Sequence, residues 1–216
     1  MVHHLAKQHS LINTWIHELR DVEVQQDRMR FRRNMERIGE VAAYEISKVL
    51  GYQPLEVTTP LAIYNGIQLN RQPVVATILR AGVPLYQGIL NYFDKADSAF
   101  IAAYRKHKPD ESFEINQEYV TCPNLDGRTL IIADPMLATG ASLVMALEEL
   151  HDYGQPDEVH VVVAIACEEG IEAIQKKFPT FTIWAADIDE ELTAKGYIVP
   201  GLGDAGDLSF GQKMQF

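Results

Sequence analysis

Short apolar runs alternate along the chain with stretches of helical periodicity. Uninterrupted apolar runs are typical of strands that are buried on both faces of a sheet. Such runs span residues 73–79, 99–104, 130–133 and 158–166. A helical pattern follows the first, third and fourth of them, for example over residues 84–94. Strands that alternate with helices predict an α/β fold, in which a mostly parallel, twisted sheet is flanked by helices.

The two ends of the chain and two internal segments depart from this alternation. Residues 1–22 are predicted to form an N-terminal arm, and residues 24–50 a charged amphipathic helix. Residues 57–61 are a candidate for a short edge strand. Residues 105–127 are polar and then alternate weakly, which predicts a flap or a protruding β arm. Residues 187–216 close the chain with a segment rich in Gly and Asp.

Composition and charge narrow the class of protein. The chain of 216 residues has no repeat or long linker, which predicts a single domain. A formal net charge of −11 argues against nonspecific binding to nucleic acid or membrane. Cys122 and Cys167 form no CxxC pair and are expected to be free thiols in a reducing compartment. There is no run of 18 apolar residues and no signal-peptide pattern, so we expect a cytoplasmic protein.

Residues 130–142 carry the strongest functional signal. An apolar run ends in Asp134, and a loop of small residues then leads into a helical pattern over 143–150. Backbone N–H groups of residues 139–142 would point at an anion from the N-terminus of that helix. Asp134 would bind hydroxyls of an attached sugar, which predicts a site for ribose 5-phosphate. A structural turn packed with small residues is the alternative, and a P-loop is excluded because its Gly-Lys-Ser/Thr end is missing.

A second glycine motif lies near the C-terminus. Residues 201–206 satisfy GxGxxG, but Pro200 precedes the motif and only a short tail follows, so a dinucleotide-binding turn is excluded. Glycines also allow a ligand to approach the main chain closely, so residues 196–207 are predicted to bind one through backbone groups. The alternative is a structural turn.

Two arginines each follow an apolar strand directly, Arg80 after the first run and Arg105 after the second. The guanidinium group is a planar set of donors that suits phosphate, so this pair is predicted to bind a diphosphate. The alternative is that each arginine is an ordinary surface residue with no role in binding. No catalytic triad can be assembled, and Cys167 is expected to be a buried structural thiol.

Other charged residues receive structural interpretations. The arginines of the long helix are expected to form a solvated face or an interface rather than a nucleic-acid site; they are Arg28, Arg30, Arg32, Arg33 and Arg37. Four histidines lack metal-ligand spacing and are expected to be residues of the N-terminal arm; they are His3, His4, His9 and His17.

Taken together, these motifs resemble the uracil phosphoribosyltransferase family. Residues 134–140 are similar to its motif for 5-phospho-α-D-ribose 1-diphosphate (PRPP), with Pro135 where most other phosphoribosyltransferases have a second acid. Residues 196–207 resemble its uracil-binding segment. Further matches lie at residues 44–45, 78–82, 104–105 and 169–171. The similarity extends from about residue 40 to residue 211.

The resemblance implies a type I phosphoribosyltransferase core with a C-terminal hood over residues 187–216. The implied reaction converts uracil and PRPP to UMP and diphosphate in pyrimidine salvage. The implied catalytic residues are Arg80, Arg105 and Asp204. The implied PRPP-binding residues are Arg80, Arg105, Asp134, Pro135, Met136, Leu137, Ala138, Thr139, Gly140, Ala141, Ser142 and Asp204. The implied uracil-binding residues are Tyr197, Ile198, Gly203, Asp204 and Ala205.

The resemblance also implies partners. Mg²⁺ is expected to be held mainly through PRPP rather than by direct protein ligands. A homodimer or higher homo-oligomer is expected, and some members are activated by GTP. A phosphoribosyltransferase for another base and a non-catalytic regulator that senses pyrimidine nucleotides are the alternatives. The chain departs from the family pattern at residues 20–31, in the flap sequence 106–112, at Glu168 and at Leu208.

Overall fold

The computed structural model describes residues 1–107 and 113–213, and among these the side chains of 103–118 are not described. The strands of the central sheet are β1 (Val2–His4), β4 (Val74–Leu79), β5 (Asp97–His107), β6 (Phe113–Thr121), β7 (Thr129–Ala133), β8 (Met136–Leu137), β9 (Glu158–Cys167) and β10 (Thr182–Asp189). Their order is β1-β10-β9-β7-β4-β5-β6, with β8 paired to β9. All pairings are parallel except β5 with β6, so the predicted fold class is confirmed.

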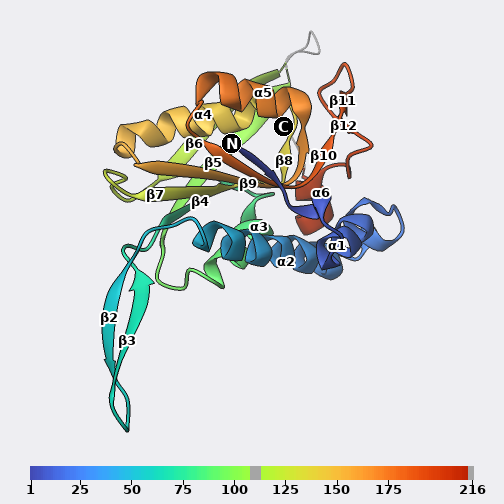
Figure 1. Cartoon of the computed structure of the whole chain (residues 1–216). Coiled ribbons are helices and arrows are strands. Elements are labelled where there is room, and N and C mark those ends of the chain that lie inside the picture. The colour runs from blue at the N-terminus through green and yellow to red at the C-terminus, as the bar shows by residue number, and fades with distance from the viewer. Residues whose placement is uncertain (108–112, 214–216) are drawn as a thin grey trace.

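Helices cover both faces of this sheet (Figure 1). One face carries α1 (Leu11–Arg20), α2 (Arg28–Ser47) and α3 (Val83–Leu90), and the other carries α4 (Ala141–Leu150) and α5 (Glu168–Lys177). Successive side chains of a strand point to opposite faces, so each buried strand contributes to two cores. In β4, Val75 joins the core under α1–α3, whereas Val74 joins the core under α4 and α5.

Short elements complete the described fold. The 3₁₀ turns are Leu5–Lys7, Val24–Gln26 and His151–Tyr153, and the last helix is α6 (Ala205–Phe210). In the part of the chain that the structure describes, no helix has the length and apolar character needed to cross a bilayer.

The prediction of an N-terminal arm is wrong. Residues 2–4 form β1, which pairs in parallel with residues 183–185 of β10 at the edge of the sheet. Residues 11–20 form α1, whose first turn is closed by a reciprocal capping box between Ser10 and Asn13. A strand of three residues is too short to give a recognisable alternation in the sequence.

The edge strand predicted at residues 57–61 is also wrong. Residues 52–69 form a separate antiparallel hairpin of β2 (Tyr52–Thr58) and β3 (Ile63–Leu69), here called the β2–β3 arm. The arm projects away from the body of the molecule (Figure 1). At its tip, the Thr59 hydroxyl donates to the Ala62 carbonyl, 2.8 Å away.

The segment predicted as a flap or β arm is an antiparallel hairpin of β5 and β6 as far as it is described. The register shifts between Ala102 and Ala103, where the hairpin leaves the parallel part of the sheet. Residues 108–112 lie outside the described residues.

β10 was not predicted from the sequence, and the predicted hood starts too early in the chain. β10 pairs in parallel with β9 and continues to Asp189, so residues 187–189 belong to the sheet. The rest of the described hood contains the antiparallel pair β11 (Glu191–Leu192) and β12 (Ile198–Val199), followed by α6.

Candidate active site

The predicted site segments meet at one edge of the sheet. β4 connects through α3 to β5, and β7 connects through α4 to β9, so the two crossovers leave the adjacent pair β4–β7 in opposite directions. In open α/β sheets, ligands bind beyond the carboxyl ends of the strands at such a switch point. Arg80 follows β4 and Asp134 follows β7 at this point.

The loop after β4 packs closely against the end of β7. The Thr77 hydroxyl donates to the Ala133 carbonyl at 3.2 Å, in the buried interior. A Cβ on Gly82 would lie 2.6 Å from the same carbonyl oxygen, so a larger residue would separate the two loops. The peptide bond between Leu79 and Arg80 is cis.

Residues 134–142, here called the anion loop, have the predicted strand–loop–helix form. The structure adds the short strand β8 within the loop, where Leu137 pairs with Ala166 of β9. Gly140 precedes α4 with φ +80°, a conformation that glycine adopts readily. The first N–H groups of a helix have no partner within the helix, so the start of α4 offers donors to an anion. Phosphate binding here stays a prediction.

The hood lies beside the anion loop. A Cβ on Gly196 would lie 3.5 Å from the Thr139 Cγ2 atom. Of the predicted uracil-binding residues, Ile198 and Ala205 are buried, Tyr197 is exposed, and Gly203 has φ +95°. The structure therefore brings these two predicted segments together, although they are about 60 residues apart in the sequence.

Charged side chains gather where α6 faces the loop after β4. The Asp204 carboxylate accepts the Asp207 N–H at 2.9 Å and the Lys213 ammonium at 3.0 Å. The Arg80 guanidinium lies 3.5 Å from Asp207 Oδ1. Burial alone would raise the pKa of Asp204, but the Asp207 N–H and Lys213 outweigh it and lower the pKa below its usual value. Asp204 is therefore an anion at neutral pH.

The structure gives only partial information on Arg105. Its backbone lies in β5 and pairs with Ile115 of β6, while its side chain lies outside the described part. Arg105 was predicted to follow its strand directly, but β5 continues to His107, so Arg105 lies within the hairpin of β5 and β6. β5 is the neighbour of β4, the strand that Arg80 follows. Its predicted diphosphate role stays a prediction.

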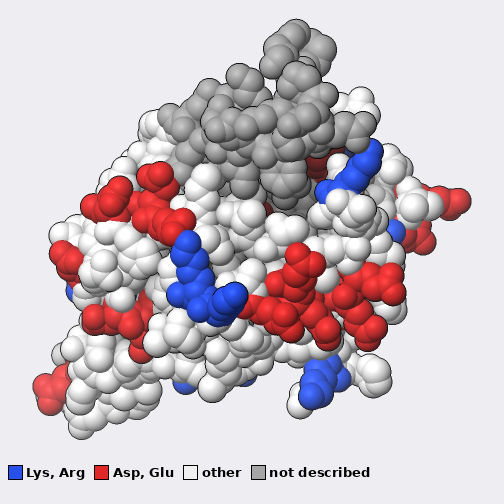
Figure 2. Space-filling view, turned by 90° about the horizontal axis from the view of Figure 1, so that it is seen from above, with Lys and Arg blue, Asp and Glu red and all other residues white. Residues whose placement is uncertain are grey.

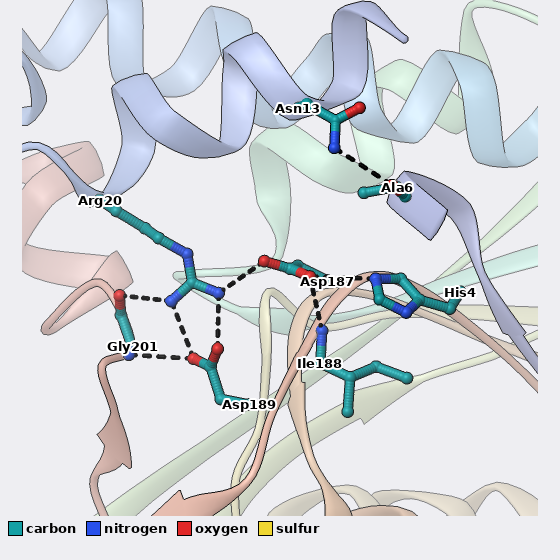
Figure 3. A network of polar contacts seen from close by, with 8 residues as sticks. All are labelled: His4, Ala6, Asn13, Arg20, Asp187, Ile188, Asp189 and Gly201. Atoms are coloured by element: carbon teal, nitrogen blue, oxygen red, sulfur yellow. Dashed lines mark hydrogen bonds and ion pairs between the residues drawn. The ribbon is translucent and has the colours of Figure 1, made fainter. Parts of the chain in front are cut away.

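Sequence reasoning missed a polar network behind the hood. Arg20, at the end of α1, donates to Asp187, to Asp189 and to the Gly201 carbonyl (Figure 3). These partners lie 167 to 181 residues away in the chain, and no local pattern links them to Arg20. Only the position of Asp187 and Asp189 near the end of an apolar strand was visible in the sequence.

The arginines of α2 make contacts within the molecule. Arg30 pairs with Glu18, and Arg33 pairs with Glu36. Arg32 donates to the Ser209 carbonyl at 2.7 Å, which joins α2 to α6. The face seen in Figure 2 carries several groups of Asp and Glu and only separate, small groups of Lys and Arg among its described residues. Among the residues that are described, no group of three or more His, Cys, Asp or Glu side chains is arranged to hold a metal ion.

The fold and the site define a type I phosphoribosyltransferase: a mostly parallel sheet, an anion loop at its switch point and a hood above it. The family model for uracil phosphoribosyltransferase matches residues 6–212, and the chain belongs to this family.

Relatives and a solved structure agree with this assignment. A uracil phosphoribosyltransferase of Porphyromonas gingivalis is 48% identical over 212 residues, which cover 98% of each chain. That of Pyrococcus furiosus is 41% identical over 201 residues, covering 92% of this chain and 85% of the relative. The structure of the AQ2163 protein from Aquifex aeolicus superposes with a TM-score of 0.87 at 34% identity and covers 98% of both chains.

Proposed function

We propose that this chain transfers the 5-phosphoribosyl group of PRPP to uracil, giving UMP and diphosphate. The proximity of the hood to the anion loop carries the proposal, because a base bound by the hood would then lie beside a ribose phosphate bound by the loop. Membership of the uracil phosphoribosyltransferase family supports the choice of base.

The reaction breaks the bond between C1 of the ribose and the diphosphate and forms a bond from C1 to N1 of uracil, which loses its proton. Positive charge develops on the ribose and negative charge on the leaving diphosphate, so positioning and electrostatic stabilisation dominate catalysis. Arg80 and Arg105 stabilise the diphosphate. The anion loop holds the 5-phosphate through its N–H groups and the ribose hydroxyls through Asp134.

Base selectivity rests on the hood. Uracil presents an acceptor, a donor and a second acceptor along one edge, and main-chain groups around Ile198, Gly203 and Ala205 match that edge. Asp204 lies between this segment and PRPP, and Tyr197 borders the same pocket. Cytosine reverses part of the pattern, and the unpaired buried polar groups that result reduce turnover by several orders of magnitude.

Mg²⁺ would be held mainly by the oxygens of PRPP, as this cation often is by substrate phosphates. Neutralising the diphosphate charge is the chemistry that the ion supplies. Activity should be lost in a chelator and restored by added Mg²⁺.

The β2–β3 arm supports a homo-oligomer. It exposes several large apolar side chains away from the body of the molecule; they are Leu61, Ile63, Tyr64 and Ile67. Large apolar side chains exposed together on one projecting element are typical of a protein interface. The free thiols of Cys122 and Cys167 fit a cytoplasmic location. GTP activation is tested by adding GTP to the standard assay.

Steady-state rates with a panel of bases test the proposed function. At saturating PRPP and Mg²⁺, uracil should exceed cytosine, orotate and hypoxanthine in kcat/KM by at least about 10³-fold, the scale expected for a polar mismatch in a buried site. A preference for another base would favour a different phosphoribosyltransferase. Tight binding of UMP without turnover of any base would favour a nucleotide-sensing regulator.

A further inference from the structure

Arg20 joins the N-terminal part of the chain to the hood (Figure 3). One terminal nitrogen of its guanidinium donates to Asp189 Oδ2 and to the Gly201 carbonyl, each at 2.8 Å. The other donates to Asp187 Oδ2 at 2.9 Å and to Asp189 Oδ1 at 2.7 Å. The Arg20 side chain therefore donates four hydrogen bonds, although it is only 17% exposed.

Gly201 is held at both of its main-chain polar groups. Its carbonyl accepts from Arg20, and its N–H donates to Asp189 Oδ2 at 3.0 Å. Its φ is +57°, and a Cβ at this position would collide with the Ile198 carbonyl oxygen. The pair Arg20–Asp189 thus fixes the peptide from which the chain turns into Gly203 and Asp204.

The electrostatic setting favours a rigid pair. Asp189 is 6% exposed and is bidentate to Arg20, the geometry in which charge-assisted hydrogen bonds are strongest and most directional. Burial alone would lower the pKa of Arg20, but its hydrogen bonds to Asp189 and Asp187 raise it, so the guanidinium keeps its charge. Burial would raise the pKa of Asp187, and the hydrogen bonds from Arg20 and other donors lower it overall.

A second contact comes from the turn that follows Arg20. Gln25 is 7% exposed, and its side-chain amide donates to the Arg20 carbonyl at 3.0 Å. The other end of this amide, Gln25 Oε1, lies 4.0 Å from the Cβ position of Gly203. Residues 20–25 therefore border the hood at Gly201 and Gly203.

We propose that Arg20 is a positioning residue for base recognition, acting through Gly201 and Asp189. It sets the path of residues 201–203 and so the direction of the main-chain groups that meet the base, whereas Asp204 is held separately by the Asp207 N–H and Lys213. This inference rests on the proposed function of the hood. Arg20 itself contacts neither substrate, and its effect on PRPP binding is small because the anion loop is held by β8, β9 and α5.

Kinetics of Arg20 variants separate positioning from simple stability. Arg20→Ala should raise the KM for uracil by roughly tenfold to a hundredfold, the scale of a small misplacement in a site, and reduce the preference for uracil over cytosine. The dissociation constant for PRPP, measured by calorimetry, should change less than about twofold. Arg20→Lys should have a KM for uracil between those of Arg20→Ala and the wild type. An ammonium lacks the planar set of donors with which the guanidinium binds Asp189 and Gly201 together.

Two further variants complete the design. Asp189→Asn removes the charge of the partner with little change of shape and should shift the uracil KM in the same direction as Arg20→Ala. Arg30→Ala is the matched control, because Arg30 is 49% exposed and its ion pair among the described residues is with Glu18 of α1. Arg30→Ala should leave the KM for uracil and the dissociation constant for PRPP unchanged.

The outcomes are distinguishable. If the wild-type protein forms no UMP while PRPP binds, the proposed function fails, and the positioning role fails with it. If the wild type is active and folded Arg20→Lys and Asp189→Asn keep its uracil KM, only the positioning role fails. Equal changes in uracil KM and PRPP dissociation constant would likewise overturn it, since they indicate a general loss of structure. If Arg20→Ala fails to fold, Arg20→Lys and Asp189→Asn still decide between these outcomes.

Discussion

At the scale of the residue, Asp204 has two separable tasks. Its side chain caps α6 by accepting the Asp207 N–H, and its negative charge faces Lys213 and the substrate site. Asparagine is also a good N-cap, whereas alanine is not. The two substitutions therefore separate the cap from the charge.

Asp204→Asn and Asp204→Ala should both lower kcat by about a hundredfold or more if the charge orients substrate. Only Asp204→Ala should also lower the free energy of unfolding, by about 1 kcal/mol for the lost cap. Steady-state kinetics and urea unfolding measure the two effects. A near-normal kcat for Asp204→Asn would remove Asp204 from the catalytic set.

His160 predicts a pH dependence of stability at the opposite end of the sheet from the site. Its Nδ1 accepts the Trp184 indole N–H at 3.1 Å, and its side chain is almost fully buried. Burial, with a smaller contribution from the charge of His3, lowers the pKa of His160 to about 4. Unfolding restores an ordinary value near 6.5, so the unfolded chain binds the extra proton first as the pH falls.

The free energy of unfolding should therefore be unaffected by His160 above pH 6.5 and fall between pH 6.5 and 4, by on the order of 3 kcal/mol from this group. In His160→Gln, the amide oxygen accepts the same indole N–H without titrating. Urea unfolding at fixed protein concentration should show a smaller loss for the variant over this range. Parallel curves would show that other groups cause the loss.

At the scale of the element, the parallel strands and their helices were predictable, because strands buried on both faces produce apolar runs. β10 was missed because its apolar run ends in Asp187 and Asp189, which read as the start of a polar loop. Those two carboxylates are stabilised by Arg20, which is remote in the sequence. Arg80 and Asp134, by contrast, were predictable from the local sequence, because each directly follows an apolar run.

The β2–β3 arm shows a second limit of sequence patterns. Alternation predicts a strand, but it does not tell whether the apolar face packs on the same chain or elsewhere. In this arm, Ile63 and Ile67 lie four residues apart on one face of β3 and are 66% and 71% exposed. Their exposure was visible only once the fold was known.

The arm predicts a change of assembly on mutation. The double substitution Ile63→Asp and Ile67→Asp should reduce the molar mass in light scattering toward the 24.3 kDa of one chain, because desolvating two carboxylates in an interface is unfavourable. Gln68→Asp, on the other face of β3, is the matched control for charge and should have a smaller effect. A wild-type protein that is already a monomer would remove the interface proposal.

At the scale of the whole molecule, an acidic protein binds a strongly anionic substrate. The formal net charge is −11, so PRPP must be held by local donors rather than by the overall field. In the proposed function, Arg80 and the N-terminus of α4 are such donors. The order of the strands places both donors at the switch point of the sheet. The proximity of Gly196 to Thr139 could be seen only in the three-dimensional fold.

The products of one reaction mixture test the central claim most directly. Purified protein is incubated with uracil, PRPP and Mg²⁺, and phosphorus NMR with mass spectrometry follows every phosphate-containing species. We predict UMP and diphosphate in equal amounts, formed at the expense of PRPP and only when uracil is present. Bound but unconsumed PRPP, or its hydrolysis to ribose 5-phosphate and diphosphate without UMP, would contradict the assignment.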